Sequence, residues 1–387
     1  MIVYKAYKFK LNPSLEQKEK LNQFLGASRF IYNYYLNEKI ERYRKIGKNY
    51  FLNDMKSDLK GLQSKYEWLK EVDGCLLRTT LEDLDNAYNK FFSKTGGFPK
   101  FKSKNNKESY RTVCIRSSYK GHNYENIKLD LNKRIIKLPK LGEVRIQGYR
   151  KLKKFYARIL NATISKEANK YYVSLCVEEL IYDNNFKLNK VVGIDLGVKD
   201  LVTVSDGLKY KSISKINKYE KKLKGLQRWL SRSQKGSKNR YKIIFKIQEV
   251  NQKIRNARKY HTHLITKNLL ENNDIVFVET LKVQSMLQES NHNLARRIAN
   301  SSFSEIIRQL EYKAEWQNKK IIHINTYYPS SQLCSCCGSK NEKVKDLNIR
   351  KWTCSNCNNE NDRDINASEN ILMEGLKIYF KEVLRTN

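Results

Sequence analysis

Acidic residues are scarce in this sequence. Among its 387 residues there are 40 Asp and Glu against 76 Lys and Arg, which gives a formal net charge of +36. An AT-rich genome could raise the Lys content, but it would not lower the number of acids. Because clustered Lys and Arg attract phosphate groups, this imbalance favours a polyanionic partner. The composition therefore indicates a protein that binds nucleic acid.

Long apolar runs are also missing, and so is the cysteine pattern of a secreted protein. No run approaches the ~18 apolar residues of a membrane-spanning helix, and no signal-peptide pattern is visible. Of the eight cysteines, four form two CxxC pairs, Cys336 lies beside one pair, and Cys75, Cys114 and Cys176 are scattered singly. This distribution is typical of a reducing cytoplasm with one structural metal. We therefore expect a cytoplasmic protein with no membrane partner.

The first half of the chain changes from helical to alternating patterns. An opening strand covers residues 2–10, and Asn12-Pro13-Ser14 is a helix-start signal. Helices are predicted from Ser14 past Leu36, over 52–69 and over 76–92. From about 110 to 182 the alternation of apolar and polar residues predicts a small β-barrel or sheet, which the opening strand could complete.

An α/β pattern begins after a polar linker at residues 183–185. From Val191 onward, strands and helices follow one another in the order expected of an α/β domain. Within it, residues 211–260 form a polar helical region in which Lys and Arg far outnumber acids. This region is either a nucleic-acid contact or a solvated helical hairpin, and its charge alone does not separate the two.

Two CxxC pairs predict a zinc site near the end of the sequence. The pairs are Cys334/Cys337 and Cys354/Cys357, and their separation is typical of a four-cysteine zinc ribbon. Gly338 follows the first pair and Asn358 follows the second. Each stands where a metal-binding turn often needs a positive φ, which Gly and Asn tolerate.

Three acids predict a second metal site. Asp195 and Glu279 each follow four apolar residues of a strand, and Asp364 begins a helix directly after the ribbon. Carboxylates that converge on one pocket repel each other unless a proton or a cation intervenes. Two Mg²⁺ ions would resolve this repulsion and would suit phosphodiester hydrolysis. Asp362 is an alternative third acid, and spacing alone does not separate it from Asp364.

These motifs resemble the RuvC nuclease of the TnpB family, the transposon-encoded RNA-guided DNA endonucleases related to type V CRISPR effectors. The resemblance rests on GIDLG, VFVET and the ribbon that leads into DRDINASENI, and it is supported by AYKFKLNPSLEQKEKLNQFLGASRFIYN, GGFPKFKSK, RIIKLPKLGEVRI and YYPSSQLCSCCG. It covers essentially the whole chain. It implies catalytic, Mg²⁺-binding acids at Asp195, Glu279 and Asp364, and one structural Zn²⁺ on Cys334, Cys337, Cys354 and Cys357.

The resemblance also implies a multidomain fold of α+β and α/β parts. A wedge domain, an oligonucleotide-binding-like β-barrel, would cover 1–10 and 110–185, with a helical recognition lobe inserted at 11–109. An RNase H-like RuvC nuclease domain would cover 186–329 and 360–387, with the zinc ribbon inserted at 330–359. The implied partners are a guide RNA from the transposon end and double-stranded target DNA, in a bacterial or archaeal cytoplasm near the nucleoid, with no protein oligomer required.

Several basic residues are candidate nucleic-acid contacts. Arg78 and Thr79 are candidates for reading a short motif beside the target, although an ordinary exposed helix face would explain them equally. Lys100, Lys102 and Lys104 are candidate phosphate contacts, and Arg363 either contacts the scissile phosphate or pairs with a nearby acid.

Two other functions remain open at this point. One is a guide-dependent DNA-binding repressor without cleavage, which loss of an acid would favour; here all three positions are filled. The other is an RNase H-like transposase, which the order Asp–Glu–Asp disfavours because such enzymes normally present Asp–Asp–Glu.

Overall fold

The computed structural model of the protein describes residues 2–104, 108–119, 122–147, 156–180, 188–346 and 348–386. The chain divides into two compact units, Met1–Tyr182 and Asp183–Asn387. Within the described ranges, no helix is both long enough and apolar enough to cross a bilayer.

Three helices form one layer of the first unit. They are α1 (Leu15–Ile46), α2 (Leu52–Lys65) and α3 (Gly74–Phe92), with a 3₁₀ turn, η1, at Glu67–Glu71. The side chain of Ser14 caps α1 by accepting from the N–H of Gln17, as the start signal predicted. The helix predicted over 52–69 ends earlier, at Lys65. The helix predicted from 76 begins at Gly74, because Asp73 caps it by accepting from the N–H of Cys75.

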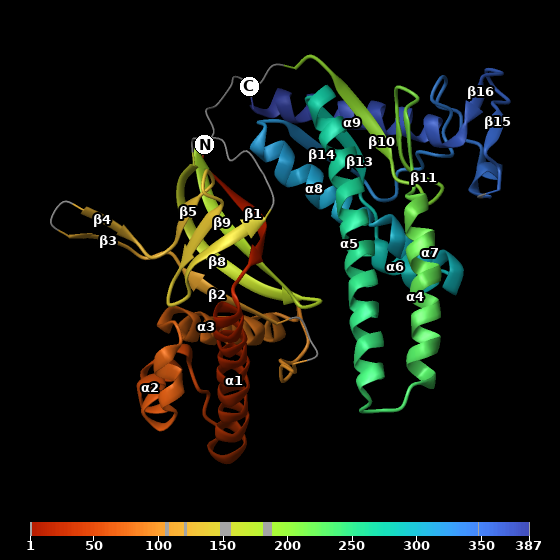
Figure 1. Ribbon diagram of the computed structural model, residues 1–387. Coiled ribbons are helices and arrows are strands. Elements are labelled where there is room, and N and C mark those ends of the chain that lie inside the picture. Colours follow the sequence, from red (N-terminus) through yellow and green to blue (C-terminus); the bar gives the residue numbers. More distant parts are fainter. Residues whose placement is uncertain are drawn as a thin grey trace. The chain divides into compact units, whose positions relative to one another are not determined.

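An antiparallel sheet forms the rest of the first unit (Figure 1). Its strands are β1 (Ile2–Asn12), β2 (Glu108–Val113), β5 (Lys128–Asp130), β6 (Ile135–Leu138), β7 (Gly142–Gln147), β8 (Tyr156–Glu167) and β9 (Lys170–Leu180), in the order β2-β8-β9-β1-β7-β6-β5. The first strand, β1, therefore lies between β9 and β7, although both of these strands are far from β1 in the sequence. A separate hairpin joins β3 (Arg116–Tyr119) to β4 (His122–Glu125). Buried side chains of α1, α3 and the sheet share one apolar core.

The second unit is built on a mixed five-stranded sheet. Its strands are β10 (Val191–Asp195), β11 (Asp200–Val204), β12 (Lys209–Lys211), β13 (Ile275–Glu279) and β14 (Lys320–Ile324), in the order β12-β11-β10-β13-β14. β10, β13 and β14 are parallel, whereas β11 and β12 are antiparallel to their neighbours. Strands buried on both faces read as continuous apolar runs, which is why these sequences lack alternation.

Helices cover both faces of this sheet. The helices of this unit are α4 (Ser214–Arg232), α5 (Lys238–Asn272), α6 (Val283–Glu289), α7 (His292–Ser301), α8 (Phe303–Trp316) and α9 (Arg363–Thr386), of which α4 packs on α5. Val276 and Val278 share a core with α5 and α8, whereas Ile275 and Phe277 pack with Ile371 of α9 on the opposite face. Alternate residues of β13 therefore point to opposite faces of the sheet, where they pack against different helices.

Close contact between α9 and the sheet requires glycine on β10. A Cβ on Gly193 would collide with the backbone oxygen of Ser368 and would lie 2.5 Å from the backbone nitrogen of Leu372. Ala367 and Ser368 are themselves fully buried, as expected for small residues at a helix–sheet contact. This approach of backbone to backbone fixes the first turns of α9 over the end of β10.

The region predicted as polar and helical at 211–260 forms a hairpin of α4 and the first part of α5 (Figure 1). A small core of Ile216, Leu226, Val250 and Ile254 joins the two helices. Trp229, three residues after Leu226, lies outside this core and is 60% exposed. Successive residues of a helix are about 100° apart, so Trp229 lies well away from the stripe that continues at Leu230.

Candidate active site and metal centre

Asp195 and Glu279 end two neighbouring parallel strands. Ile194 of β10 is opposite Val278 of β13, so the next residue along each strand is an acid. Both carboxylates therefore emerge at the same edge of the sheet, the edge formed by the carboxyl ends of the parallel strands. Loops at this edge are where open α/β sheets bind their ligands.

Asp364 lies in the first turn of α9, which packs on β10. Burial raises the pKa of Asp195 well above its usual range, and the charges of Glu279 and Asp364 raise it further. Burial also raises the pKa of Glu279 to about 7. The charges of Glu279 and Asp364 therefore reach Asp195, although among the described residues only the four cysteines below lie close enough together to form a complete metal-ligand group. Acids that influence one another in this way bind a proton or a cation in preference to standing fully charged, and their oxygen donors suit Mg²⁺.

Asp362 has a different environment. The ammonium of Lys209 donates to both of its carboxylate oxygens at 2.9 Å. Its Oδ1 also accepts from the backbone N–H groups of Asp364 and Ile365, at 3.1 and 3.2 Å. Asp362 thus caps the N-terminus of α9 and has a cationic partner, and it does not figure among the charges that raise the pKa of Asp195.

Two arginines connect Asp364 to the preceding loop. The Nη1 of Arg350 donates to Asp364 Oδ1 at 3.1 Å. Arg363 is 8% exposed, and its Nη1 donates to the backbone oxygen of Asp346 at 2.7 Å. The backbone N–H of Arg363 donates to the oxygen of Arg350. Arg363 therefore holds the loop in place, and Arg350 orients the carboxylate.

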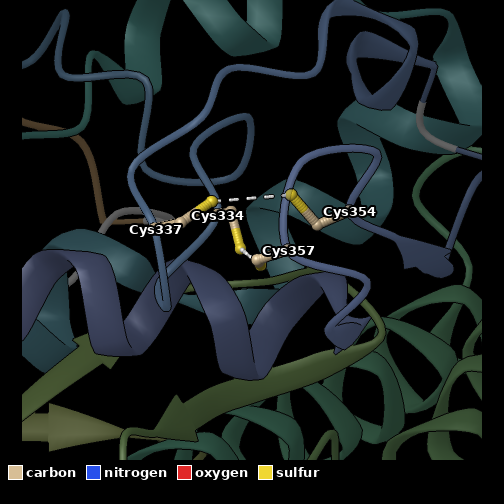
Figure 2. Close-up of side chains that lie close together, drawn as sticks. All are labelled: Cys334, Cys337, Cys354 and Cys357. Atoms are coloured by element: carbon tan, nitrogen blue, oxygen red, sulfur yellow. Dashed lines mark hydrogen bonds between the residues drawn. The ribbon is translucent and has the colours of Figure 1, made fainter.

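Four cysteines form the second cluster (Figure 2). The Sγ atoms of Cys334, Cys337, Cys354 and Cys357 all lie within 4.8 Å of one another. Sγ of Cys334 is 3.6 Å from that of Cys357, and Sγ of Cys337 is 3.6 Å from that of Cys354. Tetrahedral zinc with Zn–S bonds of about 2.3 Å would separate its sulfurs by about 3.8 Å. The cluster therefore fits a structural Zn²⁺, and these separations are far beyond a disulfide bond.

Equivalent backbone turns present the two pairs. In the first, Cys334 donates to Ser339 and accepts from Gly338; in the second, Cys354 donates to Asn359 and accepts from Asn358. Gly338 has φ 73° and Asn358 has φ 55°, so the positive φ predicted at both positions is confirmed. The side chain of Asn356 and the N–H of Ser339 lower the pKa of Cys337 to about 6, whereas, despite the N–H of Asn359, burial and the neighbouring thiols raise that of Cys357 to about 12. Four thiols this close together therefore do not all ionise unless a cation binds them. Cys336 is exposed and outside the cluster.

Two asparagines of α9 connect the ribbon to the helix. Asn366 Nδ2 donates to the oxygen of Leu333 at 2.7 Å, and Asn370 Nδ2 donates to the same oxygen and to that of Ser330. Asn366 Oδ1 also accepts from the N–H of Ser335. Both asparagines are almost fully buried. Neither asparagine was predicted from the sequence, although two Asn four residues apart, on the helix face that bears Ala367 and Ile371, were a usable signal.

The candidate nucleic-acid residues lie in varied surroundings in the first unit. Arg78, Lys100 and Lys104 are exposed. Thr79 is 3% exposed, and its hydroxyl donates to the backbone oxygen of Arg111 at 2.6 Å. The ammonium of Lys102 lies 3.9 Å from the centre of the Tyr32 ring, and burial lowers its pKa.

Together, the two-unit fold, the acidic edge and the four-cysteine cluster give the chain a fold of the class seen in Cas12 effectors. The chain is similar in fold to the protein in the "Cryo-EM structure of the Cas12f1-sgRNA-target DNA complex", with a TM-score of 0.56 and 15% identity over 96% of this chain and 98% of that one. Residues 303–371 match the family model "Cas12f1-like, TNB domain".

More similar relatives define the family. "Putative RNA-guided DNA endonuclease InsQ" of Escherichia coli K12 is 31% identical over 96% of this chain and 92% of its own length. "Putative RNA-guided DNA endonuclease" of Streptomyces pristinaespiralis is 31% identical over 97% and 90%. The chain belongs to the TnpB family. Its residues 174–290 match the model "Probable transposase", and residues 1–48 match "Helix-turn-helix domain", although here they form β1 and the single long helix α1.

Proposed function

We propose that the protein is an RNA-guided DNA endonuclease that hydrolyses target DNA beside a short transposon-associated motif, through one Mg²⁺-dependent RuvC-type site. Its relatives of similar length are named as endonucleases of this kind. The observation that carries the proposal is the placement of Asp195 and Glu279 at the ends of neighbouring parallel strands, where the charges of Glu279 and Asp364 raise the pKa of Asp195. The strand order and directions of that sheet fit an RNase H-like domain.

The three carboxylates would hold two Mg²⁺ ions. Bound there, the metal would activate water and stabilise the leaving oxygen in an in-line displacement. The protein's own contribution is positional: β10 and β13 hold Asp195 and Glu279 side by side, and Arg350 orients Asp364. Burial raises the free energy of the charged carboxylates, which increases their affinity for a cation.

The zinc ribbon has a structural role in this proposal. Its ligands are Cys334, Cys337, Cys354 and Cys357, and its base is hydrogen-bonded to α9 through Asn366 and Asn370. A folded ribbon would keep the first turn of α9, and so Asp364, over the end of β10. Zinc would take no part in the chemistry.

Recognition would be divided between base pairing and protein contacts. The guide RNA, from the transposon end, would read the target by pairing, while the protein reads backbone shape and the short motif. The sheet of the first unit would serve as the wedge barrel and its helices as the recognition lobe. The exposed Arg78, Lys100 and Lys104 would contact phosphates or base edges, whereas Lys102, Thr79 and Arg363 have partners within the protein.

The test is cleavage by the complex that the protein forms in cells. The copurifying RNA is sequenced, and the complex is incubated with Mg²⁺ and a target library with randomised flanks. Wild type should cut, whereas Asp195→Ala and Asp364→Ala should lose at least about 100-fold in rate, since metal supplies several kcal/mol of transition-state stabilisation, and should keep RNA binding. Asp206→Asn, an exposed acid in the turn after β11, is the matched control.

Three outcomes would contradict the proposal. Cutting by Asp195→Ala at the wild-type rate would refute the site. Guide-dependent binding without cleavage by wild type would identify a repressor. Strand joining in place of hydrolysis would identify a transposase.

A further inference from the structure

A cavity of about 430 Å³ lies within the second unit, apart from the three acids. Its walls come from the turn between β10 and β11, from α4 and α5, and from the junction of α7 and α8. Lys199, Arg258 and Arg297 contribute cationic side chains, and none of the described residues that line it is Asp or Glu. The cavity is therefore a positively charged site of the size that holds small ligands, roughly 300–1,000 Å³.

Apolar side chains form another part of the same wall. Val198, Ile213 and Ile216 line the cavity together with the cationic groups. A site for a simple inorganic anion would not need an apolar surface, and a site for a purely apolar ligand would not contain three cations. The combination fits a ligand with one anionic group and one flat apolar part.

Two polar atoms of this wall lack a hydrogen-bond partner among the described residues. Nε of Arg258 and Nδ1 of His261 are buried without a hydrogen bond. The Nη2 of Arg258 donates to Asn300, so its guanidinium is held in place. Buried polar atoms normally have a protein or solvent partner, and those that lack one need an explanation.

The N-terminus of α8 borders the cavity and adds an electrostatic field that favours an anion. Ser302, its N-cap, lines the cavity, has φ 56°, and makes no side-chain cap to the helix. Residues held at positive φ without being Gly cluster at functional sites. The N–H groups at a helix N-terminus attract phosphates. This end of α8 and the three cations border the same cavity.

We propose that this cavity binds one nucleotide of a nucleic-acid strand. The phosphate would lie among Lys199, Arg297 and the start of α8, and the base would lie against Val198, Ile213 and Ile216. Lys199 follows Asp195 by four residues, in the loop at the acidic edge of the sheet. A strand held in the cavity would therefore pass close to the acids. The inference rests on the proposed function only in taking nucleic acid as the partner.

The experiment is photocrosslinking of the full-length protein without divalent cation. Short single strands carrying 4-thiothymidine (DNA) or 4-thiouridine (RNA) are irradiated with the protein, and crosslinked peptides are identified by mass spectrometry. We expect crosslinks on the segments around Lys199, Arg258 and Arg297. Whichever strand yields them identifies the source of the nucleotide.

Two variants, each with a control, distinguish binding in the cavity from general electrostatic attraction to the protein. Asn217→Trp, on the exposed side of α4 that lines the cavity, fills the space without altering net charge; Gln227→Trp, an exposed residue of α4 away from the cavity, is its control. Arg297→Gln removes a lining charge, and Arg228→Gln removes an exposed charge of α4 that does not line the cavity. The first variant of each pair should lower crosslinking at the cavity roughly tenfold, comparable to the loss of one stacked base.

The results that overturn the inference are distinct from those that overturn the endonuclease. Absence of crosslinks at the cavity with both strands would refute it. Equal losses in each variant and its control would show general electrostatic attraction only. A protein that crosslinks here but cuts no DNA would contradict the proposed cleavage and keep the nucleotide site, and the converse result would do the reverse.

Discussion

Glu279 shows how a single buried carboxyl can link stability to pH. Its carboxyl lies at the end of a strand buried on both faces, and burial raises its pKa from 4.5 to about 7. The folded protein therefore binds this proton more tightly than the unfolded chain does. Without a cation, stability falls as the pH rises from about 4.5, and the full loss is present above about 7.

Glu279→Gln should therefore stabilise the Mg²⁺-free protein in a pH-dependent way. A neutral amide removes the cost of the buried charge, so the gain should be about 1 kcal/mol at about pH 5 and should approach about 3 kcal/mol at about pH 8. Urea denaturation in buffer without divalent cation measures it, with Asp206→Asn as the exposed control. A gain that is the same at both pH values would show that the carboxyl titrates normally.

The sequence predicted some of these residues better than others. Strand-end acids after apolar runs are visible as patterns, so Asp195 and Glu279 could be proposed from the sequence. Asp362 and Asp364 could not be separated by spacing, because a capping acid and a first-turn acid look alike until Lys209 and the N–H groups of α9 are located. Asn366 was missed because its partners lie 33 residues away along the chain, at Leu333.

At the scale of elements, the ribbon and α9 are joined by buried hydrogen bonds. The four cysteine thiols of the two CxxC turns lie close together, and Asn366 and Asn370 of α9 form hydrogen bonds with the backbone of Ser335 and Ser330, beside the first of these turns. Buried hydrogen bonds to backbone oxygens are costly to leave unmade. Loss of the metal should therefore affect the start of α9 as well as the ribbon.

Replacing one zinc ligand tests this coupling. Cys354→Ser should reduce bound zinc from one per chain to near zero and lower the melting temperature, because metal binding contributes directly to folding. Hydrogen exchange should increase at residues 362–370 as well as in the ribbon. Cys336→Ser, which changes an exposed thiol outside the cluster, should keep both zinc and stability. Unchanged protection of 362–370 in Cys354→Ser would show that α9 holds its position independently.

Elements were predictable where local patterns decide them. The CxxC turns, the strands at 191–195 and 275–279, and the capped start of α1 follow from a few neighbouring residues. The place of β1 between β9 and β7 depends on pairing across 130 residues or more, so the sequence indicated only that the strand could join the others. The contact of α9 with β10 requires glycine at position 193, because a Cβ there would collide with the backbone of α9. This requirement cannot be seen in the sequence until the position of the helix is known.

At the scale of the whole molecule, the dominant property is the net charge of +36. No single patch accounts for it, since each unit carries many exposed Lys and Arg. A charge of this size destabilises a compact protein through self-repulsion unless a polyanion neutralises it. The guide RNA would be that polyanion, so RNA binding and stability should rise together.

The affinity for guide RNA should consequently fall steeply with salt. Each phosphate contact contributes about −0.7 to the slope of log K against log salt, so ten contacts would give a slope near −7 and a loss of roughly 10⁴-fold between about 50 and 200 mM. Filter binding over this range measures the slope. Lys100→Gln should reduce its magnitude by about 0.7 if that ammonium contacts a phosphate, whereas Asp195→Ala should leave it unchanged because removing an acid removes no phosphate contact. An affinity that does not change with salt would mean that the excess positive charge does not contact RNA phosphates, since counterion release accompanies every phosphate that a protein neutralises.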